Sequence, residues 1–144
     1  MKHVVNVAVR EPDLDPRSLR ARVKDRQDTE GAKKEVLRDT YYLICRKDEK
    51  KEKPGPTRRL TCGHTTIYPT GSTTGHAHDD MEEIYYFVSG EGTMVVGDDT
   101  FDVKAGDACY VPPGQYHTTI QKGIMPLVIL WTTCRVDGDA SLNK

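Results

Sequence analysis

Two histidines one residue apart, His76 and His78, are the side chains of this chain best placed to bind a metal ion. In an extended segment, side chains two residues apart point the same way, so both imidazoles can face one cavity. A turn after His78 would bring Glu83 back beside them on the next strand, where Tyr85 and Phe87 share its face. Two imidazoles and a carboxylate that converge from neighbouring strands predict a site for a first-row transition metal.

The spacing of these residues resembles the first motif of the cupin superfamily, His-x-His-x4-Glu-x6-Gly, with matches at His76, His78, Glu83 and Gly90. A second stretch resembles the second cupin motif, Gly-x5-Pro-x-Gly-x2-His-x3-Asn, with matches at Gly106, Pro112, Gly114 and His117. Gln121 stands where that motif ends in Asn. The resemblance selects Glu83 over Glu82, because only Glu83 is followed by six residues and then Gly90. It also adds His117 as a fourth ligand.

The resemblance therefore implies one divalent transition metal per chain, bound by His76, His78, Glu83 and His117. Imidazole and carboxylate ligands suit Fe, Mn, Ni, Co or Zn, and the general order of affinity does not choose among them. Four protein ligands leave open positions on an ion that prefers five or six. A substrate carbonyl bound there would be polarised.

Short stretches rich in β-branched and aromatic residues predict the strands that position these motifs. They lie at residues 41–45, 60–68, 109–111 and 126–133. A tight hairpin is expected where residues 93–96 and 100–103 flank Gly97. The pattern predicts an all-β, double-sheet jelly roll. The resemblance implies that it is the cupin double-stranded β-helix barrel, with a charged N-terminal extension.

The composition divides the chain into three parts. Residues 1–38 begin with a weakly alternating stretch, Met1–Val9, that we expect to be a strand or arm, and continue as a charged, weakly helical segment. Residues 39–136 form the barrel, and residues 137–144 are a polar tail. A chain of 144 residues is long enough for one domain with one core.

The composition also argues against several classes of partner. The net charge of −1 gives no long-range attraction to nucleic acid or to an anionic membrane. No apolar run approaches the ~20 residues of a membrane span. No apolar signal core follows Met1, so we expect a cytoplasmic protein. In that compartment we expect reduced, mostly buried thiols at Cys45, Cys62, Cys109 and Cys134.

Several shorter stretches resemble the archaeal cupin-type phosphoglucose isomerases, among them 65–69, 73–78, 83–86 and 110–113. This resemblance implies isomerisation of a sugar phosphate, with substrate-binding roles for Thr73, Gly75, Tyr85 and Tyr42. It also implies proton transfer by Glu83 or Tyr85. Two residues are missing between His78 and Glu83 relative to that family, and the loop before His76 is shorter. Arg46 and Arg59 are candidates for a phosphate contact.

Two other functions remain open at this level. The same ligand set suits a non-haem metal dioxygenase or decarboxylase, because the cupin fold supports many reactions. A non-catalytic cupin that binds a small molecule is the third reading. In every case we expect a homodimer, because the edges of a jelly roll need covering.

Overall fold

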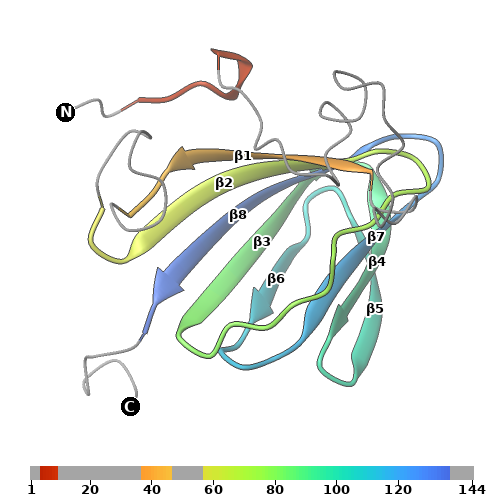
Figure 1. Ribbon diagram of the computed structural model, residues 1–144. Helices are drawn as coiled ribbons and strands as arrows, with labels where there is room; N and C mark the ends of the chain where they lie inside the picture. The colour runs from red at the N-terminus through yellow and green to blue at the C-terminus, as the bar shows by residue number, and fades with distance from the viewer. Residues whose placement is uncertain (1–3, 10–36, 47–56, 137–144) are drawn as a thin grey trace, which may run out of the picture.

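The strands form two antiparallel sheets around one core, as the computed structural model shows for residues 4–9, 37–46 and 57–136 (Figure 1). The larger sheet has the order β1-β2-β8-β3-β6, and the smaller one has the order β5-β4-β7. In chain order the strands are β1 (Arg38–Ile44), β2 (Leu60–Ile67), β3 (Met81–Ser89), β4 (Glu91–Val96), β5 (Asp99–Lys104), β6 (Ala108–Val111), β7 (His117–Lys122) and β8 (Leu127–Arg135). The predicted all-β jelly roll is confirmed.

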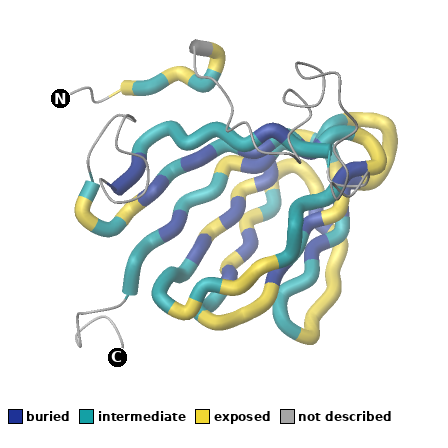
Figure 2. The backbone as a smooth tube through the Cα atoms, viewed as in Figure 1, coloured by how far each residue is buried: buried dark blue, intermediate teal, exposed yellow. Residues whose placement is uncertain are grey.

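Burial alternates along β2 and β3 of the larger sheet, which Figure 2 shows as repeated changes of colour along these strands. On β3, Glu83 and Phe87 are buried, whereas Ile84 and Val88 are exposed. Side chains of a strand project to alternate faces, so the odd positions of β3 face the core. The prediction that Glu83, Tyr85 and Phe87 share a face is confirmed.

The apolar core and the polar residues occupy opposite ends of the same strands. Ile67 pairs with Leu127, and Phe87 pairs with Ile129, all four of them almost fully buried. Met94 and Val103 of the smaller sheet join this cluster. Farther along the same two strands, Glu83 of β3 pairs with Thr133 of β8. Burial of each large apolar side chain contributes roughly 1.5–3 kcal/mol to the stability of the fold. The apolar end of the barrel thus stabilises the protein, and the polar end carries the candidate site.

Gly90 marks the point where the chain leaves the larger sheet for the smaller one, between β3 and β4. Its φ of +84° lies in the left-handed region that L side chains rarely adopt. A Cβ at this position would also overlap the carbonyl oxygen of Pro126. The backbone geometry therefore explains why glycine stands at this motif position.

The expected N-terminal strand is wrong for residues 4–9. Val7–Val9 form a short 3-10 helix, and the side chain of Asn6 accepts a hydrogen bond from the backbone N–H of Ala8 at 2.9 Å. Such local side-chain bonds compete with strand pairing. The charged segment expected over most of residues 1–38 and the polar tail at 137–144 lie outside the described residues.

The hairpin at Gly97 is confirmed, since β4 and β5 pair in register on either side of it. β1 begins at Arg38, three residues earlier than the predicted strand at 41–45. All four cysteines are free, and Cys45 and Cys109 are buried. Among the residues described, no helix has the length and apolar character that a membrane crossing requires.

Candidate metal centre

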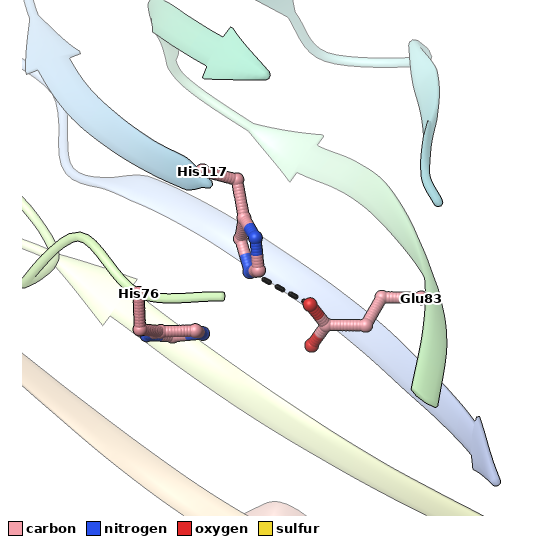
Figure 3. A group of neighbouring side chains, drawn as sticks. All are labelled: His76, Glu83 and His117. Carbon is pink, nitrogen blue, oxygen red and sulfur yellow. Dashed lines mark ion pairs between the residues drawn. The ribbon is translucent and has the colours of Figure 1, made fainter. Parts of the chain in front are cut away.

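Three side chains from separate segments converge at the polar end of the barrel: His76, Glu83 and His117 (Figure 3). Glu83 lies on β3 of the larger sheet, and His117 is the first residue of β7 in the smaller sheet. His76 lies in the connection from β2 to β3. The backbones of His76 and His117 form an isolated antiparallel bridge, with N–H to carbonyl distances of 2.9 and 3.2 Å. Each sheet thus contributes to the site, and the bridge fixes the connecting segment.

The potential ligand atoms of these three residues all lie within 4.8 Å of one another. Nε2 of His117 is 2.7 Å from Oε2 of Glu83. His117 and Glu83 are only 2% and 5% exposed, whereas His76 is exposed. The group is therefore shielded from solvent at Glu83 and His117 and accessible at His76, where a ligand can approach.

Both histidines are oriented by a carbonyl two residues earlier. Nδ1 of His76 lies 3.2 Å from the carbonyl oxygen of Thr74, and Nδ1 of His117 lies 3.1 Å from that of Gln115. A carbonyl only accepts hydrogen bonds, so in the neutral ring Nδ1 carries the proton and Nε2 keeps its lone pair. Histidines that bind metals usually have this arrangement.

The Nε2 atom of His117 is buried and has no well-directed hydrogen bond. Its lone pair and the carboxylate oxygen of Glu83 would repel each other at 2.7 Å, so the contact needs a positive charge between the two atoms. A proton or a divalent cation supplies that charge. The donor set and this unsatisfied atom therefore fit a first-row metal.

The pKa values of the two histidines follow from the same contacts. Burial lowers the pKa of His76, and the neighbouring rings of His117 and His78 lower it further, so this imidazole stays neutral. Burial by itself would lower the pKa of His117 as well, but the close carboxylate of Glu83 favours the protonated ring and raises the pKa overall. The position between His117 and Glu83 thus attracts a cation.

His78 lies beside this group and not within it. Its ring centroid is 4.6 Å from that of His76 and 6.2 Å from that of His117. Among the described residues, the set of close ligand atoms comprises only His76, Glu83 and His117. The segment that carries His76 and His78 forms an isolated bridge and no regular strand, yet both residues line the same cavity, as their spacing predicts. His78 remains our predicted fourth ligand, and rotation of its side chain would be needed to bring a nitrogen to the group.

A cavity of about 510 Å³ lies next to His76, His78 and Glu83. The residues predicted to bind substrate all line it: Tyr42, Thr73, Gly75 and Tyr85. The hydroxyl of Thr73 also accepts the backbone N–H of Thr119 at 2.9 Å, so this side chain holds the smaller sheet as well. His117 lies behind the lining and reaches the cavity only through its neighbours.

Sequence reasoning missed several residues of the cavity wall. The indole of Trp131 lies across Gly63, where any Cβ would overlap it, and its N–H donates to the hydroxyl of Thr65 at 2.9 Å. Arg38 and Thr133 also line the cavity, whereas the arginines considered for an anion contact, Arg46 and Arg59, do not. Once it is known that the odd positions of β8 face inward, the alternation of the strand places Trp131 and Thr133 on the inner face.

Tyr85 is buried in the wall between the core and the metal group. Burial raises the pKa of its phenol well above 10, and the charge of Glu83 raises it further. The phenol therefore stays protonated at any physiological pH. It can donate a hydrogen bond or a proton, but it cannot serve as a base there.

Thr133→Val is expected to raise the free energy of unfolding by about 1 kcal/mol, because an apolar group of the same shape replaces a buried hydroxyl without a partner. Thr133 is 4% exposed, and its Oγ1 makes no hydrogen bond. Urea unfolding measures the change. Thr119→Val is the matched control, since Thr119 is also buried with an unpartnered Oγ1 but does not line the cavity.

Both variants should gain stability, and only Thr133→Val should weaken ligand binding in the cavity. A loss of stability in Thr133→Val would show that its hydroxyl has a partner in solution, and would contradict the prediction.

Comparison with known proteins identifies a family and several relatives. Residues 63–133 match the family model described as Cupin domain. An uncharacterized protein of Methanocaldococcus jannaschii is 45% identical over 65 residues, which are 44% of this chain and 52% of that protein. An oxalate-binding protein of Thermotoga maritima is 36% identical over 63 residues, which are 43% of this chain and 52% of that protein.

A glucose-6-phosphate isomerase of Thermococcus litoralis is 34% identical over 95 residues, which are 57% of this chain and 48% of that enzyme. The chain thus spans about half the length of the curated relatives that it matches. Their names point to more than one small molecule, so the choice among ligands must come from the cavity itself.

Proposed function

Because this chain belongs to the cupin superfamily, we propose that it is a metal-dependent enzyme that interconverts the aldose and ketose forms of a sugar phosphate. The observation that carries the proposal is a single cavity whose wall contains both groups of proposed residues. These are the metal-binding side chains His76, His78 and Glu83 and the substrate-binding residues Tyr42, Thr73, Gly75 and Tyr85. Sequence identity to a glucose-6-phosphate isomerase supports this class.

In this proposal His76, His78, Glu83 and His117 hold one divalent transition metal, which is Fe, Mn, Ni, Co or Zn. When bound, such an ion polarises a carbonyl and stabilises negative charge on its oxygen. The carbonyls behind the Nδ1 atoms of His76 and His117 keep the rings oriented before substrate arrives. Preorganisation of this kind lowers the reorganisation needed during the reaction.

Isomerisation moves a proton between the two carbon atoms next to the reacting oxygens. Within the described part of the chain, Glu83 is the only carboxylate that lines the cavity, so we assign it the role of proton acceptor. A carboxylate has two oxygens, and one can contact the metal while the other exchanges a proton. The phenol of Tyr85, which stays protonated, is assigned a hydrogen bond to a substrate oxygen.

The size of the cavity favours a sugar phosphate over a two-carbon acid. Its volume of about 510 Å³ falls within the usual range for sites that enclose a drug-sized ligand. Oxalate would fill only a small part of it. The wall also offers threonine hydroxyls and aromatic faces at Thr65, Tyr42 and Trp131, which suit a polyol.

The test is conversion of fructose 6-phosphate to glucose 6-phosphate by protein that has been stripped of metal and reloaded separately with iron, manganese, nickel, cobalt or zinc. We expect one metal to restore turnover and His117→Ala to remove it. Absence of turnover with every metal, in protein shown by elemental analysis to contain that metal, would reject the isomerase.

The second candidate is a metal-dependent decarboxylase or dioxygenase. The 36% identity to an oxalate-binding protein favours it, and the same ligand set supports such chemistry. Release of carbon dioxide or uptake of oxygen with oxalate would identify it. Tight binding of oxalate or of a sugar phosphate without turnover would instead favour a non-catalytic binding protein.

We also propose a homodimer that forms through the outer face of the larger sheet. On this face Ile84, Tyr86 and Val88 of β3 are 56%, 45% and 49% exposed, beside the exposed Tyr110 and Leu130. Apolar patches of this kind often mark interfaces. Light scattering that gives the mass of one chain at micromolar concentration would reject the dimer.

A cytoplasmic location is the remaining part of the proposal. All four cysteines are free, and disulfides are rare in reducing compartments. Fractionation of cells, followed by detection of the protein in the extracellular fraction, would contradict it.

A further inference from the structure

Among the residues that the structure describes, Arg38 is the only lysine or arginine that lines the cavity. It begins β1, an edge strand of the larger sheet, and β2 and β8 separate this strand from β3, which carries Glu83. Strands of a sheet are about 4.8 Å apart, so β1 and β3 are roughly 14 Å apart across the sheet. A ligand that contacts both residues must be elongated.

Two threonine hydroxyls, of Thr40 and Thr65, line the cavity next to Arg38. Nη1 of Arg38 donates to Oγ1 of Thr40 at 3.2 Å, and this oxygen lies 3.2 Å from Oγ1 of Thr65. Thr65 in turn accepts the indole N–H of Trp131. These contacts position the guanidinium on the cavity wall.

The chemistry of this end of the cavity differs from that of the metal end. A guanidinium presents planar N–H donors that match the oxygens of a phosphate and can bind two of them at once. The other end offers imidazoles and one carboxylate. This carboxylate would repel a dianion unless a metal were bound. The two ends are therefore suited to different parts of one molecule.

We propose that Arg38 recognises a terminal phosphate group of an elongated ligand whose other end reaches the group formed by His76, Glu83 and His117. The inference rests on the proposed function for the chemistry at the metal end. The anion site itself can be tested without any turnover.

The experiment measures the binding of inorganic phosphate to the zinc-loaded full chain by titration calorimetry and phosphorus NMR. Arg38→Met keeps a side chain of similar length without the charge, and we expect it to weaken phosphate binding by about 10- to 100-fold, the usual effect of a charge-assisted hydrogen bond. Arg38→Lys should recover part of the affinity. Arg58→Met is the control, because Arg58 is exposed and does not line the cavity.

A second comparison uses fructose 6-phosphate and fructose. Arg38→Met should lose affinity for the phosphorylated sugar and leave the affinity for fructose unchanged. Equal phosphate affinities of Arg38→Met and the wild type would overturn the proposal, because any binding would then be at the metal. No phosphate binding by the wild type in the millimolar range would overturn it as well.

The two proposals fail in different ways. Phosphate binding that depends on Arg38, without conversion of fructose 6-phosphate, would reject the isomerase and keep the anion site. Turnover that is unaffected by Arg38→Met would keep the isomerase and reject the site. Similar thermal unfolding midpoints for the two Arg38 variants and the control would show that the fold is intact.

Discussion

Glu83→Gln should weaken the binding of divalent transition metal by more than about 100-fold. The carboxylate supplies the only negative charge among the proposed ligands, and it lies 2.7 Å from Nε2 of His117. Loss of a residue that merely supports a ligand typically lowers metal affinity 10- to 100-fold, so loss of a charged ligand should exceed that range. Competition with a fluorescent chelator, followed by elemental analysis after dialysis, measures the change.

Glu82→Gln is the matched control for this prediction. Glu82 is the neighbouring residue on β3, but its carboxylate accepts a hydrogen bond from the phenol of Tyr110 at 2.9 Å and does not line the cavity. We expect unchanged metal binding in this variant. Full metal occupancy in Glu83→Gln, or equal losses in the two variants, would contradict the assignment of the ligand.

This pair of variants also tests how far the sequence determines the site. The motif spacing selects Glu83, and the alternation of β3 explains the choice, because only the odd positions face the core. The same reasoning placed Tyr85 and Phe87 on the inner face correctly. Period-two patterns are reliable here because β3 is buried on one side only, so a shift of one residue would expose its whole apolar set.

The cavity wall was much harder to predict. Arg38, Thr65 and Trp131 come from strands that are far apart in the sequence, and they meet because the sheet order places β2 and β8 between β1 and β3. A single sequence shows which residues share a face of one strand, but it does not show which strands are neighbours. The anion site proposed at Arg38 therefore became visible only with the topology.

Local interactions explain where alternation misled and what fixes the segment of His76 and His78. At Val7–Val9 the side chain of Asn6 satisfies a backbone N–H, so these residues form a 3-10 turn. Between β2 and β3, the backbone of His76 pairs with His117 at a single bridge. This bridge fixes the backbone of His76, and the spacing of two residues brings His78 to the wall of the same cavity.

Tyr85→Phe should lower kcat for the proposed isomerisation by about 100-fold or more, the usual loss when one hydrogen-bond donor to a substrate oxygen that gains negative charge is removed. The substitution removes only the phenol oxygen. It keeps the ring, which packs edge-on against His117 at 5.9 Å between centroids and against Phe87 at 6.5 Å. Because burial and Glu83 hold the pKa of the phenol well above 10, the wild-type residue always carries its proton at neutral pH.

Tyr42→Phe is the control, because it removes a different phenol from the wall of the same cavity. It shows whether the loss of any hydroxyl there would lower kcat. Tyr42 lines the same cavity and packs edge-on against Trp131, with 5.4 Å between the ring centroids. We expect Tyr42→Phe to raise KM more than it lowers kcat, and Tyr85→Phe to do the reverse with its metal content unchanged. Wild-type kcat in Tyr85→Phe would contradict the hydrogen bond assigned to the phenol. Loss of metal in that variant would mean instead that the phenol supports the ligands, because a donor to the substrate has no effect on the metal before substrate binds.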